Sequence, residues 1–220
     1  MRIEEAGWIA NQSIDGPVLE LASATGRFRT ISQPHIDRLI HAPLRARGLE
    51  IVHADLKAEP GVDIVGDFTD PVVESQLRAV EAQTVLCCNL LEHVLDREAM
   101  AALCDRLLRP GGLLIVTVPL SVPFHNDPID TYYRPRPDQI AALFPSYVVE
   151  DAEIVKSTTF GQDLMRSKTS IPLFIAKSIW RIVPFWRGWK TYLHMNHRML
   201  WLLRPYRISC VALRKPLTAT

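Results

Sequence analysis

Apolar residues in the first half of this chain gather in short runs, each followed by a polar or acidic position. A run without polar alternation is typical of a strand that is buried on both faces of a sheet, and TVLCCNL at 84–90 is the clearest example. The strongest helical periodicity follows at 97–108, where Asp96 is the expected N-cap. The pattern predicts strands at 17–22, 49–55, 62–67, 84–90, 113–118, 147–155 and 206–213, and helices at 31–47 and 97–108.

Proline and glycine set the expected limits of the two helices. Pro34 and Pro43 should limit the ends of the first one, because proline breaks a helix interior. The RPGG segment at 109–112 should end the second one.

Strands that alternate with helices through residue 118 predict an α/β fold with a parallel, doubly wound sheet. Ligands of such sheets bind beyond the carboxyl ends of the strands, and Glu20, Asp55 and Asp67 are expected near that edge. The fold class is therefore α/β, a Rossmann-like doubly wound seven-stranded sheet with a helical insertion before the last strand. The expected division is a core at 1–165, a basic Trp-rich insertion at 166–205, and the last strand with a tail at 206–220.

Charge divides the chain more sharply than its net value of +1 indicates. No Asp or Glu follows Asp163, whereas eleven Lys and Arg residues lie between Arg166 and Lys215. The remainder holds 14 basic and 24 acidic residues, a net charge of −10. A core with that charge would repel a phosphate backbone, so methylation or binding of nucleic acid is disfavoured.

The N-terminal residues and the cysteines point to a reducing compartment. The first 16 residues, MRIEEAGWIANQSIDG, are polar and acidic and do not form a secretory signal. None of the four cysteines belongs to a CxxC pair, and Cys87 and Cys88 lie within an apolar run. We expect a cytoplasmic protein.

The segment PVLELASATGRF at 17–28 has the form of a nucleotide-type cofactor loop between a strand and a helix. Ala22 and Ala24 occupy positions where such a loop usually has glycine, and Gly26 remains. An alanine forced to positive φ costs roughly 1 kcal/mol. The segment alone is equally consistent with a plain strand–turn–helix connection that binds nothing.

Residues 89–119, NLLEHVLDREAMAALCDRLLRPGGLLIVTVP, favour the cofactor loop. Together with LELASATGRF they resemble the class I S-adenosylmethionine-dependent methyltransferases, in particular the type 11-like group, over about residues 15–145. The features that carry the resemblance are Leu91-Glu92-His93-Val94, the stretch from Arg106 to Gly112, and Pro119.

The resemblance implies S-adenosylmethionine as the cofactor and a role for each matching position. Glu20 and the backbone from Ala22 to Gly26 would bind the methionine end, and Asp55 would accept the ribose hydroxyls. Asp67 and Phe68 would meet the adenine, whereas Asn89 and Leu90 would line the floor near the sulfonium. Glu92 and His93 would lie at the mouth, where capping is as good an explanation as catalysis. The two alanines depart from the family pattern and put tight binding in doubt.

Two further segments resemble a bacterial subgroup of these enzymes. Only twelve residues separate Asp55 from Asp67, too few for a crossover helix, and PGVDIVGD lies in this gap. PLSVPFHNDPIDTYYR follows the fifth strand at 119–134. Genes of this subgroup often accompany surface-polysaccharide or lipid-linked sugar synthesis. The resemblance therefore implies transfer of a methyl group to an oxygen of a sugar or another small, potentially lipid-linked acceptor.

The 119–134 segment holds the best catalytic candidates. His125 is suited to act as a base for a hydroxyl acceptor, with Asp127 or Asp130 to orient it. One alternative is that these side chains only stabilise a Pro-rich loop. Another is that they bind a metal, but no other feature of the sequence supports a metal site. The candidates for the acceptor pocket are Tyr132, Tyr133 and Arg134, of which Arg134 suits a carboxylate or phosphate.

The segment at 170–207 combines basic residues with four of the five tryptophans, counting Trp201. Lys177, Arg181 and Pro184 interrupt its apolar run, so it is not a transmembrane span. It is either an interfacial element on anionic lipid, a nucleic-acid binding surface, or a lid or dimer surface. The residues expected to face a membrane are Lys177, Trp180, Arg181, Trp186, Arg187 and Trp189.

Two function classes follow from the sequence. The first is a methyltransferase, peripheral on the inner face of the cytoplasmic membrane if its acceptor is lipid-linked. The second is a non-catalytic scaffold of the same fold that docks on a membrane or on a partner enzyme. Ala22 and Ala24 favour the scaffold, and the acids Glu20, Asp55 and Asp67 favour the enzyme.

Overall fold

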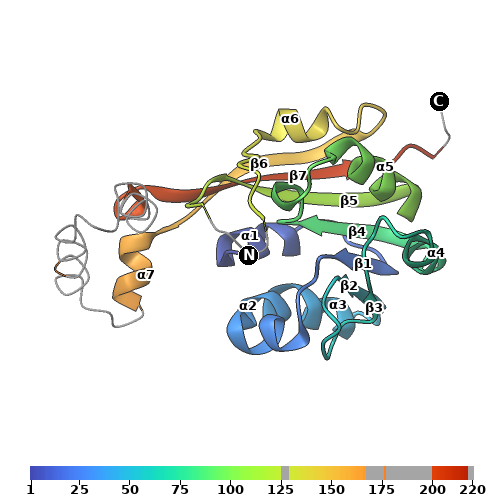
Figure 1. Cartoon of the computed structure of the whole chain (residues 1–220), viewed down its shortest axis with the longest axis horizontal. Helices are drawn as coiled ribbons and strands as arrows, with labels where there is room; N and C mark the ends of the chain where they lie inside the picture. The colour runs from blue at the N-terminus through green and yellow to red at the C-terminus, as the bar shows by residue number, and fades with distance from the viewer. Residues whose placement is uncertain (125–128, 167–175, 177–199, 218–220) are drawn as a thin grey trace, which may run out of the picture.

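A computed structural model describes residues 1–124, 129–166, 176 and 200–217. Within these ranges the chain forms a seven-stranded sheet with the order β3-β2-β1-β4-β5-β7-β6 (Figure 1). Strands β1 to β5 are parallel, whereas β7 is antiparallel to both of its neighbours. The strands are β1 (Val18–Leu21), β2 (Ile51–Asp55), β3 (Ile64–Val65), β4 (Ala82–Cys88), β5 (Leu108–Ser121), β6 (Val148–Thr159) and β7 (Pro205–Arg214).

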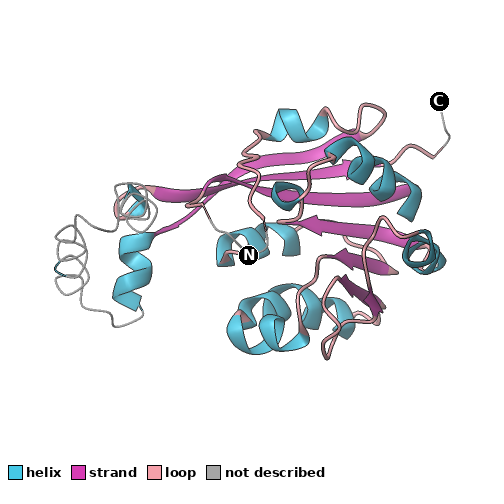
Figure 2. Cartoon of the chain, viewed as in Figure 1, coloured by secondary structure: helices cyan, strands magenta, loops and turns pink. Residues whose placement is uncertain are grey.

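Helices cover both faces of the sheet, as Figure 2 shows. Helices α4, α5 and α6 pack on one face, and α1 with the helical run after β1 packs on the other. The α-helices are α1 (Ile3–Ala10), α2 (Pro34–Ile36), α3 (Ala42–Ala46), α4 (Pro71–Ala79), α5 (Arg97–Leu107), α6 (Pro137–Ala141) and α7 (Phe160–Arg166). Two π-helical turns, η1 (Phe28–Ser32) and η2 (Asp37–His41), and a 3-10 turn, η3 (Leu91–His93), complete the described helical elements.

The central strands are buried on both faces, as their apolar runs predict. Leu19 and Leu21 of β1 belong to the core beneath α5, whereas Val18 belongs to the core beneath α1 and η2. Successive side chains of a strand point to opposite faces. Glu20 therefore shares the face of Val18, next to the helical run, and this placement decides which residues it meets.

The predicted strands are confirmed, and the third and fifth differ most in length from the prediction. The third is reduced to the two residues of β3, and the fifth extends from Leu108 through the RPGG segment to Ser121. Helix α5 ends at Leu107, next to the RPGG segment that was predicted to end it, and the chain continues directly into β5. Asp96 caps α5 as predicted, since its side chain accepts a hydrogen bond from the Ala99 backbone at 2.9 Å.

The helix expected at 31–47 begins three residues earlier and is divided. Pro34 and Pro43 lie inside the helical run instead of at its ends, each in the first turn of a new segment, α2 and α3. Proline is tolerated in a first turn because the N–H that it lacks would have no partner there. The prediction that these prolines limit the helix is wrong for this reason.

The connection between β2 and β3 contains no helix, in agreement with its length. Helix α7 ends at Arg166, where the predicted insertion at 166–205 begins, and residues 167–175 and 177–199 of that insertion lie outside the described residues. The domain division at 166 and 205 stays a prediction. None of the helices in the described ranges is long and apolar enough to cross a membrane.

Candidate functional site

The loop after β1 takes the backbone conformation of a glycine loop, although it contains alanines. Ala22 has φ 53° and Ala24 has φ 56°, both in the left-handed region. Each of these alanines is disfavoured there by about 1 kcal/mol relative to glycine. The chain therefore keeps both positions in the left-handed region and accepts backbone strain there.

The guanidinium of Arg29 holds this loop in place. Arg29 belongs to η1 and is 4% exposed. Its Nη1 donates to the Ser23 carbonyl at 3.0 Å and to the Ala24 carbonyl at 2.6 Å, and its Nη2 donates to the Gly61 carbonyl at 2.5 Å. Hydrogen bonds from a charged donor are stronger than neutral ones, so Arg29 offsets the strain of the two alanines.

The loops after β1 and β2 are packed backbone to backbone. The Gly26 amide donates to the Pro60 carbonyl at 2.9 Å. A Cβ on Gly61, which has φ +85°, would lie 2.7 Å from the Gly26 Cα, closer than a side chain can approach. Glycine is therefore required at Gly61, and the Gly26 amide is bound to the loop after β2.

Asp55 lies at the end of β2, as predicted for the residue that binds the ribose. Its Oδ2 accepts the Ala24 amide at 2.8 Å and its Oδ1 accepts the Lys57 amide at 3.0 Å. A carboxylate has about four acceptor positions, so two of them are left for hydroxyl groups of a ligand. The same carboxylate thus fixes the strained loop and faces the edge where a ligand would bind.

Glu20 forms a buried cluster with two histidines that the sequence did not reveal. His53 is its register partner on β2, and the His53 Nδ1 lies 2.7 Å from Glu20 Oε2. The His41 Nε2, from η2, lies 3.2 Å from the same oxygen but outside hydrogen-bond alignment. Burial raises the pKa of Glu20, but the contacts with His41 and His53 outweigh burial and lower the pKa to about 2. Glu20 is therefore an anion.

The predicted adenine residues separate in the structure. Asp67 is exposed, and its Oδ1 accepts the Thr69 amide at 2.9 Å and the Thr69 hydroxyl at 2.8 Å. These hydrogen bonds lower the pKa of Asp67. Phe68 is buried in the same core cluster against which Ala22 packs. Asp67 therefore lies at the surface of the edge and Phe68 beneath it.

Asn89 and Leu90 follow β4 at the same edge. Asn89 has φ 53°, and its Nδ2 donates to Glu5 Oε1 at 2.7 Å. Glu5, from α1, is buried and also accepts the Thr117 hydroxyl at 2.6 Å. Leu90 is 9% exposed. The Asn89 side chain is thus bound to α1, and Leu90 is almost fully buried. The role of these two residues near the sulfonium stays a prediction.

Glu92 is the most unusual group at this edge. It lies in η3, is fully buried, and neither of its carboxylate oxygens has a hydrogen-bond partner. Burial, together with a smaller contribution from the nearby Glu5 carboxylate, raises the pKa of Glu92 to about 8. The carboxyl is therefore mostly protonated at neutral pH. Perturbed carboxyl groups of this kind concentrate at functional sites.

The predicted catalytic segment is described in part. His125 and Asp127 lie outside the described residues. Asp130 is buried, and its carboxylate pairs with Arg134 through contacts of 2.5 and 3.0 Å. The structure thus gives Asp130 a partner within its own segment and places Arg134 on that carboxylate.

The two tyrosines of this segment have different surroundings. Tyr132 is 67% exposed and stacks on Phe124, with ring centroids 4.7 Å apart. The Arg97 guanidinium lies over the Tyr133 ring, 4.2 Å from its centroid. Tyr132 therefore remains available to an acceptor, whereas Tyr133 contacts the start of α5.

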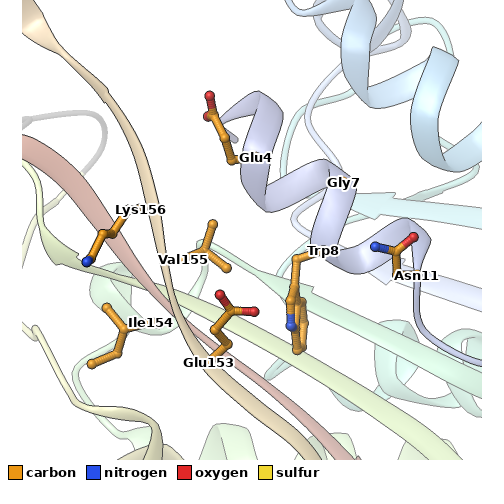
Figure 3. Close-up of a pocket in the computed structure, with 8 residues that line it drawn as sticks. All are labelled: Glu4, Gly7, Trp8, Asn11, Glu153, Ile154, Val155 and Lys156. Carbon is orange, nitrogen blue, oxygen red and sulfur yellow. The ribbon is translucent and has the colours of Figure 1, made fainter.

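A hollow of about 580 Å³ lies between α1 and β6, away from the predicted site residues (Figure 3). Trp8, Asn11 and Glu4 line it from α1, and Glu153 and Lys156 from β6. The indole N–H of Trp8 is buried without a hydrogen-bond partner. The six residues expected to face a membrane, from Lys177 to Trp189, lie outside the described part of the chain.

Comparisons with known proteins agree with this fold. The family model described as methyltransferase domain matches residues 19–116. No curated protein matches the sequence. A SAM-dependent methyltransferase from Archaeoglobus fulgidus aligns with a TM-score of 0.50 and 13% identity, over 90% of this chain and 85% of that one.

Two further solved structures are similar at comparable levels. Phosphoethanolamine N-methyltransferase 2 from Haemonchus contortus, in complex with phosphomonomethylethanolamine and S-adenosylhomocysteine, aligns with a TM-score of 0.52 and 15% identity over 94% of this chain. This chain spans about half, 51%, of that protein's length. The 1,6-didemethyltoxoflavin-N1-methyltransferase from Burkholderia thailandensis aligns with a TM-score of 0.50 and 14% identity, over 97% and 78% of the two chains.

The edge that holds Asp55, Glu20 and the left-handed loop lies within the matched range. Residues 19–116 therefore match the methyltransferase domain family model, and the chain has the class I methyltransferase fold.

Proposed function

We propose that this chain transfers a methyl group from S-adenosylmethionine to an oxygen of a sugar or another small acceptor. The observation that carries the proposal is the left-handed loop at Ala22 and Ala24, which is maintained against strain and bound by Asp55. A scaffold that binds no cofactor would have no reason to retain a strained loop. The matched methyltransferase domain supports the same reaction class.

Each part of the proposed cofactor site offers a group that fits one part of the ligand. Asp55 would accept the two ribose hydroxyls with its remaining lone pairs. The anionic Glu20 would attract the ammonium group of the methionine moiety. The backbone from Ala22 to Gly26 would lie against the chain between ribose and carboxylate. The site therefore matches a zwitterionic nucleoside with a cationic sulfur.

The chemical step is an in-line displacement. S-adenosylmethionine supplies an activated methyl group on a sulfonium. The protein would align the acceptor oxygen with that methyl, and alignment alone accounts for much of such an acceleration. The proton released by a hydroxyl acceptor needs a base at this edge. His125 stays the predicted base, and Asp130, five residues later in the sequence, is the residue predicted to orient it. Tyr132, exposed on the same segment, is the best-placed described residue to meet the acceptor.

The acceptor class rests on the 119–134 segment and its resemblance to enzymes of surface-polysaccharide synthesis. A lipid-linked sugar would also give the basic Trp-rich segment a purpose, with Lys177, Trp180, Arg181, Trp186, Arg187 and Trp189 on anionic lipid. A peripheral location on the inner face of the cytoplasmic membrane belongs to this part of the proposal. It is tested by sedimentation with vesicles that contain a tenth or more of anionic lipid.

The cofactor is tested by calorimetric titration with S-adenosylhomocysteine. We expect a dissociation constant no weaker than some hundreds of micromolar, about −5 kcal/mol. Asp55→Ala should weaken binding at least tenfold, since it removes the acceptor for the ribose hydroxyls and for the Ala24 amide. Asp70→Ala, at the exposed N-cap of α4, is the matched control and should leave the affinity unchanged. Absence of heat and of a thermal shift up to millimolar ligand would overturn the proposal.

A further inference from the structure

The cluster of Glu20, His41 and His53 is not explained by the fold alone. Burying a carboxylate and two imidazoles is unfavourable unless the groups satisfy one another. His53 comes from β2 and His41 from η2, and both meet Glu20 at Oε2. None of the described residues hydrogen-bonds to Oε1, and this atom is not among the buried unpaired ones. One oxygen of the carboxylate is thus occupied and the other remains accessible.

We propose that His41 and His53 are positioning residues for cofactor binding, which hold Glu20 by Oε2 and thereby direct Oε1 at the ammonium group of the cofactor. This inference rests on the proposed function. The Glu20 carboxylate is an anion, and its negative charge is complementary to an ammonium ion. The other charged or titratable groups near Glu20 are Arg29 from η1, whose donors are bound to loop carbonyls, and the buried thiol of Cys88 from β4.

The same three residues have the composition of a metal site, since their donor atoms lie within 4.8 Å of one another. Two observations favour a positioning role of the two histidines over a metal site. The separation of 2.7 Å between His53 Nδ1 and Glu20 Oε2 is that of a hydrogen bond, whereas neighbouring ligands of a tetrahedral zinc ion lie about 3.3 Å apart. A divalent cation would also make the cluster positive and repel the ammonium group.

The test compares two ligands that differ only in the ammonium group. S-adenosylhomocysteine carries the ammonium, and its deamino analogue lacks it. The wild-type protein should bind S-adenosylhomocysteine at least tenfold more tightly than the analogue. In His53→Ala this preference should fall below about threefold, because weakening should be confined to the ligand with the ammonium. A merely structural role for His53 would weaken both ligands equally and would overturn the inference.

Conservative variants separate hydrogen bonding from packing. His53→Asn retains a donor near the position of Nδ1 and should recover most of the preference, whereas His53→Gln should not. His41→Ala should act in the same direction as His53→Ala. His35→Ala is the matched control, since His35 contacts the Met1 carbonyl and lies outside the cluster. Should the alanine variants fail to fold, the contrast between His53→Asn and His53→Gln decides the question alone.

Three further results of the titrations would each decide between the explanations. If the wild-type protein binds neither ligand, the proposed function fails and the inference fails with it. If the wild-type protein binds both equally, the inference alone fails. The titration is repeated after treatment with a chelator and after addition of zinc chloride. Binding of S-adenosylhomocysteine that is lost with the chelator and restored by zinc would overturn the positioning role and assign the cluster to the metal.

Discussion

Glu92→Gln is expected to stabilise the protein, and the gain should grow as the pH rises. The pKa of the buried Glu92 carboxyl is raised to about 8 from an ordinary value of 4.5. Below pH 4.5 both the folded and the unfolded chain hold the proton, so the carboxyl has no pH-linked effect. Between pH 4.5 and 8 the unfolded chain releases the proton and the folded chain retains it, so the free energy of unfolding falls as the pH rises. Glutamine has the same shape and does not ionise, which removes this loss.

Urea unfolding at pH 5, 7 and 8.5 measures the effect. At about 1.4 kcal/mol per unit of pH, the advantage of Glu92→Gln should reach roughly 3 kcal/mol at pH 7 and roughly 5 kcal/mol at pH 8.5, both upper estimates. Glu98→Gln, at an exposed position of α5, is the matched control and should show no such trend. A difference that does not vary with pH would contradict the assigned protonation state.

The expected gain also bears on function. A residue whose replacement stabilises the protein by several kcal/mol is seldom retained for stability. Glu92 lies just past β4, at the ligand edge of the sheet, and neither of its oxygens has a hydrogen-bond partner among the described residues. Because glutamine has the shape of the protonated carboxyl that Glu92 carries at neutral pH, we expect Glu92→Gln to bind S-adenosylhomocysteine as the wild-type protein does.

The strands could be predicted because each central one is buried on both faces and carries an uninterrupted apolar run. The helices that the sequence did not reveal are short or carry weak periodicity: α1, α4, α6 and α7 have five to nine residues each. Helices of this length gain most of their stability from tertiary packing. For α4 the signal was present, since Asp70 and Pro71 form an N-cap followed by proline in the first turn.

The acids of the site could be predicted because strand ends converge at one edge, but their partners could not. His53 meets Glu20 only because of the register of β2 against β1, and His41 only because η2 packs over the same face. No local pattern carries that information. By contrast, the pair Asp130 and Arg134 has a spacing of four residues, so the possibility of an ion pair between two predicted site residues was visible in the sequence.

Arg29→Met is expected to have the largest effect on the cofactor site. The change leaves the carbonyls of Ser23, Ala24 and Gly61 without their charged donor. We expect a loss of roughly 3–5 kcal/mol in the free energy of unfolding, since each hydrogen bond to a charged group contributes about 1.5–3 kcal/mol and the losses overlap. Binding of S-adenosylhomocysteine should weaken at least tenfold. Arg27→Met, at an exposed neighbouring position, is the matched control.

Glycine at the two strained positions should rescue the affinity of Arg29→Met. With Arg29 removed, Ala22 and Ala24 are free to leave the left-handed region, where alanine is disfavoured, whereas glycine has no such preference. In the wild-type protein the double change Ala22→Gly with Ala24→Gly should alter affinity little, because Arg29 already holds the loop. In the Arg29→Met protein the same change should recover about tenfold, a coupling of about 1.4 kcal/mol in a double-mutant cycle. Additive effects would instead mean that Arg29 acts on the cofactor independently of the conformation of the loop.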